Sequence, residues 1–73
     1  MKIDLDLRGR ACPIPIVELM KSMRRCASGD TVEIKANDRA FPIDVAAWCK
    51  KTGHPLVSFE THGHDYVALV RKP

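Results

Sequence analysis

Two segments in which polar and apolar residues alternate strictly constrain the fold of this chain more than any other feature. They are Lys2–Leu7 and Thr31–Ala36, and a period of two predicts strands with one buried face. The residues between them carry apolar side chains at helical spacing. A strand, a helix and a second strand in this order predict a βαβ unit, with parallel strands and a right-handed crossover.

The helical pattern predicts a first helix over Pro13–Ala27 that packs one apolar stripe on the sheet. Pro13 is expected at the first helical position, where its fixed φ suits a helix, and Pro15 still lies inside the first turn. Gly29 is expected to stop the helix in the left-handed conformation. The stripe is predicted to comprise Ile16, Leu19, Met20, Met23 and Ala27, and the solvent-facing side Glu18, Lys21, Ser22 and Arg25.

The second half of the chain predicts a strand, a helix and a hairpin. In the strand Thr31–Ala36, the apolar residues Val32, Ile34 and Ala36 are expected to face the core. Asp38 is the expected N-cap of a helix that ends at Thr52-Gly53. This helix is expected to bury one stripe and to turn its charges toward water; the stripe is Phe41, Val45, Trp48 and Cys49, and the charges are Asp44, Lys50 and Lys51.

Two further strands, Leu56–Thr61 and Tyr66–Arg71, are predicted to be joined by a turn at His62–Asp65. The order of elements is then βαβαββ. We expect a two-layer α/β sandwich, with two helices on one face of a mixed four-stranded sheet. Residues 1–73 are expected to form a single domain.

Cys12 lies at the predicted junction between the first strand and the first helix. The positive end of a helix dipole and nearby cations favour a thiolate, and Arg8 and Arg10 are on the same loop. Loops that leave neighbouring parallel strands emerge at one edge of a sheet, so Asn37-Asp38 is expected beside Cys12. Beyond capping, Asp38 could orient either arginine or polarise a transferring sulfur. The sequence thus predicts an exposed nucleophile, with a buried, inert cysteine as the alternative.

Spacing bears on the other chemistries open to cysteine and histidine. No pair among the three cysteines and three histidines has the spacing of a structural zinc site, so no metal or other cofactor is predicted. A continuous first helix places Cys12 about 21 Å from Cys26 at about 1.5 Å per residue. A disulfide needs Cα atoms within about 7 Å, which excludes Cys26 as a resolving partner, and Cys49 is expected in the core.

Charge and hydropathy bear on the cellular location and on the class of partner. No apolar run is long enough to span a membrane and no signal-peptide pattern is present, so we expect a cytoplasmic protein with no membrane partner. The formal net charge of +3 suits encounters with acidic protein surfaces. By itself it is too small to indicate direct nucleic-acid binding. A monomer is expected because the predicted elements bury one core.

The residues around Cys12 resemble the signature of a known family. Leu5-Asp6-Leu7-Arg8-Gly9 followed by Cys12-Pro13-Ile14-Pro15 is similar to the Cys-Pro-x-Pro motif of the TusA-like (SirA-like) sulfur carriers. Comparable residues recur along nearly the whole chain, at Gly29-Asp30, Asn37-Asp38, Asp44-Val45, Trp48-Cys49, Gly53-His54 and the strand that begins at Tyr66. The chain departs from the family at Arg39, where a proline is usual.

This resemblance implies the sandwich already predicted, which is similar to the C-terminal domain of translation initiation factor three. It also implies that Cys12 accepts a sulfane sulfur as a persulfide from a cysteine desulfurase or a rhodanese-type donor. The sulfur then passes to an acceptor protein, so the chain is a carrier rather than a turnover enzyme on its own. The pathway served stays open among transfer-RNA thiolation, cofactor assembly and sulfur oxidation.

Individual roles follow from the same resemblance. Cys12 inherits the sulfur-accepting role, and Gly9, Pro13 and Pro15 inherit a positioning role. Electrostatic or partner contacts are expected from Arg8, Arg10 and Asp38.

A second hypothesis is an RNA-binding or regulatory module that uses a basic face. That face would comprise Arg8, Arg10, Lys21, Arg24 and Arg25. The fold analogy to a ribosome-binding domain supports it only as analogy. Against it, the chain has neither RNP-type stacking aromatics nor a Gly-x-x-Gly clamp, and the hypothesis leaves the Cys12 motif without a purpose.

Overall fold

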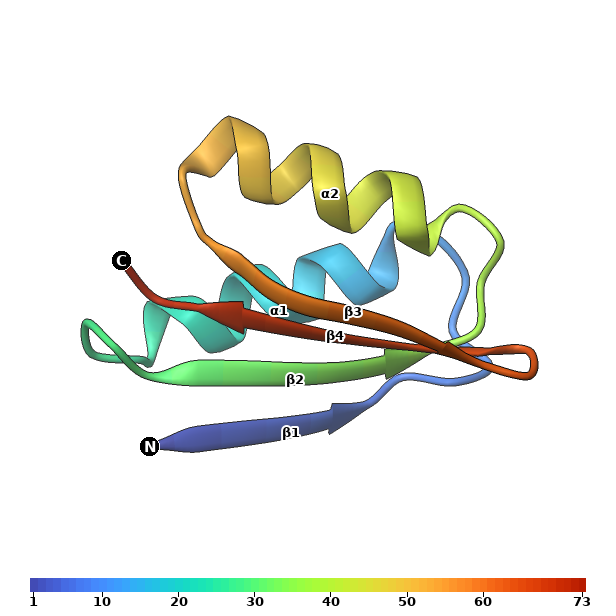
Figure 1. Ribbon diagram of the computed structural model, residues 1–73, viewed down its shortest axis with the longest axis horizontal. Coiled ribbons are helices and arrows are strands. Elements are labelled where there is room, and N and C mark those ends of the chain that lie inside the picture. The colour runs from blue at the N-terminus through green and yellow to red at the C-terminus, as the bar shows by residue number, and fades with distance from the viewer.

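The computed structural model describes residues 1–73 and confirms the predicted sandwich, with two helices on one face of a mixed four-stranded sheet (Figure 1). The sheet order is β1-β2-β4-β3; β1 and β2 pair in parallel, and the other pairs are antiparallel. The elements are β1 (Lys2–Asp6), α1 (Ile14–Arg24), β2 (Thr31–Ala36), α2 (Phe41–Thr52), β3 (Leu56–His62) and β4 (Asp65–Arg71).

The core lies between the helices and one face of β2 and β4. Val32, Ile34 and Ala36 are fully buried, as the alternation predicts. On the neighbouring strand Val70 pairs with Val32 and Ala68 with Ile34, and both are also fully buried. The helices complete this core with Leu19, Met23, Phe41, Val45 and Cys49. This apolar core fixes the two central strands against both helices.

Helix α1 is shorter than predicted at both ends. It begins at Ile14 with Pro13 as its N-cap, and it ends at Arg24. The Ala27 N–H donates to the carboxylate of Asp30 at 3.0 Å instead of continuing the helical ladder. A side-chain acceptor of this kind competes with the helix. Gly29, with φ 92°, therefore belongs to the turn that precedes β2 and not to the helix end.

The buried stripe of α1 also differs from the prediction. Pro15, Leu19, Ser22 and Met23 are its buried residues. Ser22, expected in solvent, is only 6% exposed, whereas Ala27 is exposed. The stripe has helical spacing but is rotated about the axis relative to the predicted one, because Pro15 in the first turn takes the inward position.

Helix α2 does not begin at the predicted cap. Its N-cap is Ala40, and Asp38 lies two residues earlier. The Asp38 carboxylate accepts the backbone N–H of Ala40 at 3.1 Å, so it closes an Asx-type turn before the helix. The helix ends as predicted, with Gly53 left-handed at φ 78° and its N–H donating to the Cys49 carbonyl.

The hairpin turn is tighter than predicted. Both strands extend into the predicted four-residue turn, so only Gly63 and His64 connect β3 to β4. Gly63 has φ 64°, a conformation that glycine adopts without steric cost and that two-residue hairpins favour.

Both helices begin at one end of the molecule and end at the other (Figure 1). The carboxyl end of β1, the start of both helices and the β3–β4 turn all lie at the same end. The two chain termini lie at the opposite end. Neither helix is long and apolar enough to cross a membrane.

Candidate functional site around Cys12

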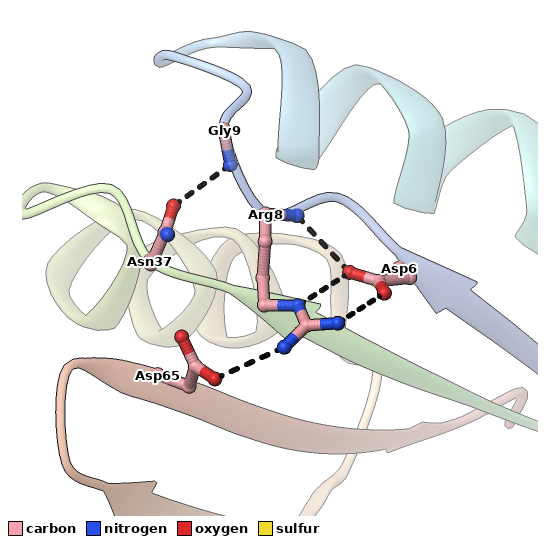
Figure 2. A network of polar contacts seen from close by, with 5 residues as sticks. All are labelled: Asp6, Arg8, Gly9, Asn37 and Asp65. Carbon is pink, nitrogen blue, oxygen red and sulfur yellow. Dashed lines mark hydrogen bonds and ion pairs between the residues drawn. The ribbon is translucent and has the colours of Figure 1, made fainter.

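The loop after β1 is held against the loop after β2, which confirms the prediction that they share one sheet edge. The backbone N–H of Leu7 donates to the Lys35 carbonyl at 2.7 Å. The Gly9 N–H donates to the side-chain oxygen of Asn37 at 2.9 Å (Figure 2). Gly9 has φ 83°, where a residue with a Cβ is strained. We call this edge the Cys12 rim, and it comprises residues 7–13, residues 37–40 and the first turn of α2.

The Arg8 side chain is paired with two carboxylates and does not provide the cation that the sequence predicts next to Cys12. Its Nε and Nη2 donate to the two Asp6 carboxylate oxygens at 2.9 and 2.7 Å, and Nη1 donates to Asp65 at 3.3 Å (Figure 2). Because β2 lies between β1 and β4, the guanidinium spans the end of β2. The hydrogen bonds from Arg8 to Asp6 lower the Asp6 pKa to about 2. Arg8 is thus engaged in tying strand ends together and is not directed at the Cys12 sulfur.

Cys12 is exposed, and its thiol donates a hydrogen bond to Oδ2 of Asp44 at 2.8 Å. Asp44 lies in the first turn of α2 and is half-buried. This hydrogen bond, then desolvation, then the negative charges of Asp44 and Asp38 raise the Cys12 pKa. The predicted preference for the thiolate is therefore wrong for the isolated chain, because carboxylates and not arginines dominate the surroundings of the sulfur.

The other predicted site residues make no hydrogen bond to the Cys12 sulfur, whose one partner is Asp44. Arg10 is exposed and takes part in none of the ion pairs of the chain. The Asp38 carboxylate is occupied by the Ala40 N–H and orients neither arginine. Pro13 is exposed next to Cys12, whereas Pro15 is buried in the first turn of α1. The Cys12–Pro13 peptide bond is cis.

The basic residues do not form the single face that the RNA-binding hypothesis requires. Arg8 and Arg10 precede α1, and Lys21, Arg24 and Arg25 lie in its last turn or at its C-cap. A helix of 11 residues is about 16 Å long at 1.5 Å per residue. The two groups therefore lie at opposite ends of α1, and Arg8 is already paired with two carboxylates.

The three cysteines differ in access. Cys12 is exposed, Cys26 is half-buried and Cys49 is 5% exposed within the core. Burial raises the pKa of the Cys49 thiol, which confirms its predicted core position. Cys12 is therefore the only cysteine of the chain in the exposed class.

Asp44 is the one site residue that sequence reasoning missed. It was expected in water with the other charged residues of α2, although its spacing of three from Phe41 and four from Trp48 places it on the apolar stripe. Its partner Cys12 is 32 residues away, so no local pattern links the two. The available signal was topological: both helices of a βαβα unit begin at the same sheet edge, which brings the first turn of α2 near the loop that carries Cys12.

Comparison with known proteins gives consistent results. Residues 3–72 match the family model described as "Sulfurtransferase TusA". The "Putative sulfur carrier protein YrkF" of Bacillus subtilis is 40% identical over 96% of this chain, which spans 38% of that relative. A "Putative sulfur carrier protein" of Archaeoglobus fulgidus is 35% identical over 93% of this chain and 92% of its own length.

A solved structure supports the fold. The SirA-like protein of Desulfitobacterium hafniense superimposes with a TM-score of 0.83, over 97% of this chain and 96% of that chain. Its sequence identity is 16%, so the similarity bears on the fold alone.

Proposed function

Because the chain belongs to the sulfurtransferase TusA family, we propose that it is a sulfur carrier whose Cys12 accepts a sulfane sulfur and relays it to an acceptor protein. The observation that carries this proposal is the position of Cys12. It is the only exposed cysteine, and it lies in the Cys-Pro-x-Pro segment within the matched residues.

Sulfur transfer between two proteins needs an accessible nucleophile and a good leaving group. The Cys12 thiolate attacks the outer sulfur of a donor persulfide, R–S–SH. A new S–S bond forms at Cys12 while the donor S–S bond breaks, and the donor leaves as the thiolate R–S⁻. The proton lost by the Cys12 thiol passes through solvent to that thiolate. The donor returns to a thiol as Cys12 becomes a persulfide, so the exchange needs no external oxidant or reductant. In delivery the Cys12 persulfide is the donor: a thiolate of the acceptor attacks its outer sulfur, the S–S bond at Cys12 breaks, and Cys12 leaves as the thiolate.

The donor that fits this chemistry is a cysteine desulfurase or a rhodanese-type protein, each of which holds a cysteine persulfide. Exposure of the Cys12 sulfur supports direct protein-to-protein transfer with no cofactor. We assign Gly9, Pro13 and Pro15 to positioning the loop, and we assign Arg10 and Asp38 to contacts with partners at the rim. Residues 1–73 carry these functions as one domain.

The experiment is intact-protein mass spectrometry after incubation with a cysteine desulfurase and cysteine, or with polysulfide. Wild-type protein should gain the mass of one sulfur atom, and dithiothreitol should remove it. Cys12→Ser should gain none. Cys26→Ser is the matched control, since it removes a less accessible thiol and should load normally. A folded Cys12→Ser protein that still loads one sulfur would refute the proposal.

A further inference from the structure

The segments at the start of the two helices bring a thiol and a carboxylate together. The loop before α1 supplies Cys12, and the first turn of α2 supplies Asp44, whose Oδ2 lies 2.8 Å from Sγ. A carboxylate that accepts a hydrogen bond from a thiol stabilises the protonated form. It also adds a negative charge next to the sulfur, which opposes formation of a second one.

The other charges around the sulfur do not cancel this effect. Asp38 adds a second negative charge from the loop between β2 and α2. Arg8 is committed to Asp6 and Asp65. Arg10 and Arg39 are exposed on the rim, and neither is among the groups that set the pKa of Cys12. Near the sulfur, the negative charges of Asp44 and Asp38 therefore counteract the positive ends of the two helix dipoles.

We propose that Asp44 is a specificity-determining residue: it keeps Cys12 protonated in the free protein and favours sulfur donors whose reacting sulfur lies beside a positive charge. This inference rests on the proposed role of Cys12 as the sulfur acceptor. A cation brought to the Asp44 carboxylate competes for the oxygen that the thiol uses and offsets the charge that disfavours the thiolate. A donor that carries Lys or Arg next to its persulfide thus activates Cys12 as it docks. A neutral or anionic electrophile does not.

Small electrophiles of defined charge test this without any donor protein. Cationic and anionic methanethiosulfonates modify a thiolate through the same reaction, in which the Cys12 sulfur bonds to the reagent sulfur and methanesulfinate leaves. The rate is read at Cys12 by peptide mass spectrometry, so Cys26 and Cys49 do not interfere. A unit charge about 6 Å from the carboxylate in water changes the rate by about threefold. The cationic reagent should therefore react about tenfold faster than the anionic one.

The variants separate charge from structure. Asp44→Asn keeps the shape of the side chain and should reduce the cationic-to-anionic ratio severalfold. Asp44→Glu restores the charge and should restore most of the ratio. Asp4→Asn removes an exposed carboxylate from β1, at a side-chain exposure of 71%, and should leave the ratio unchanged. Thermal unfolding of each variant by circular dichroism shows that the fold is intact.

A neutral reagent gives a second measurement. With iodoacetamide, Asp44→Asn should shift the pH profile of Cys12 alkylation to lower pH. Each tenfold gain in thiolate is partly offset by an about threefold fall in intrinsic nucleophilicity, so the rate at pH 7 should rise by about threefold for each such gain. An unchanged reagent ratio and an unchanged pH profile in folded Asp44→Asn would overturn the role of Asp44. Neither measurement involves sulfur loading, so this failure is distinct from failure of Cys12→Ser to lose loading.

Discussion

Gly9 and Asn37 join the two loops of the Cys12 rim through a single hydrogen bond, from the Gly9 backbone N–H to the Asn37 side-chain oxygen at 2.9 Å. Asn37 follows β2 directly, so the second strand of the βαβ unit fixes the position of the loop that carries Cys12. The sulfur thus sits on an irregular loop, but that loop is anchored to the sheet a few residues before Cys12.

Removing this anchor should destabilise the rim. Asn37→Ala leaves the Gly9 N–H without its acceptor, and we expect the free energy of unfolding to fall by about 1 kcal/mol. Asn37→Asp keeps an acceptor at the same position and should retain most of the stability. Urea unfolding at pH 7 measures both. Equal losses in the two variants would show that the hydrogen bond is not the cause.

The Arg8–Asp6 pair should make stability depend on acid pH. The Asp6 pKa in the folded protein, about 2, lies below its ordinary value of 3.8. The contribution of the pair is therefore fully present above about pH 4 and is lost as the pH falls from 4 toward 2. Arg8→Ala should flatten this part of the stability profile. Arg8→Lys should flatten it to a smaller extent, since lysine can pair with the carboxylate but lacks the bidentate fork. Lys2→Ala, at the opposite end of β1 from Asp6, should leave the profile unchanged.

His54 should make stability fall at mildly acid pH. Burial, followed by the charge of Lys72, lowers its pKa below the ordinary 6.5, and its Nε2 is buried without a hydrogen-bond partner. The unfolded chain thus binds a proton more readily, so stability is greatest above about pH 6.5 and decreases as the pH falls below it. The His54 ring lies 4.6 Å from the Trp48 ring, so tryptophan fluorescence reports unfolding next to it.

The matched variants for this prediction are His54→Gln and His64→Gln. The first should weaken the dependence between pH 7.5 and pH 5.5. The second alters an exposed histidine at the hairpin turn and should preserve it. A wild-type unfolding midpoint that does not change over this range would contradict the prediction.

Cys12 and Cys49 should show opposite phenotypes when each is replaced by serine. Cys49→Ser places a hydroxyl in the core, and we expect a loss of about 1–3 kcal/mol in the free energy of unfolding with normal sulfur loading. Cys12→Ser alters an exposed side chain and should change stability by less than about 0.5 kcal/mol while abolishing loading. Denaturant unfolding measures the stability of each variant, and mass spectrometry on the same samples measures its sulfur loading. Loss of loading in a still-folded Cys49→Ser protein would place Cys49 in the transfer route.

The sequence predicted the strands well because their evidence is local. Val32, Ile34 and Ala36 alternate with polar residues, and any strand with one buried face must turn them inward. The end of α2 at Gly53 is local in the same sense, since glycine alone reaches the left-handed conformation readily. The burial of Ser22 was predicted wrongly because Pro15 faces the core and turns the buried side of α1 toward Ser22. Two stripes offset by one residue look alike in sequence.

The electrostatics of the site could not be predicted from residues near Cys12 in the chain. Arg8 is close in sequence but is bound by Asp6 and Asp65, the latter 57 residues away. Asp44 is distant in sequence but touches the sulfur. The pKa of an exposed thiol depends on which charge points at it, and that is a property of side-chain direction. The Asp6–Arg8 spacing at a strand end was the one local sign that the arginine had a partner.

The two chain termini lie at the end of the molecule opposite the Cys12 rim (Figure 1). A polypeptide joined to either terminus leaves from that far end, so it can act as a tether without shielding the sulfur. In the Bacillus subtilis relative, the matched segment makes up only 38% of the chain, which shows that such a module occurs within longer proteins. Because the termini and Cys12 lie at opposite ends of the fold, a linker of any length at either terminus would leave the proposed partner surface accessible.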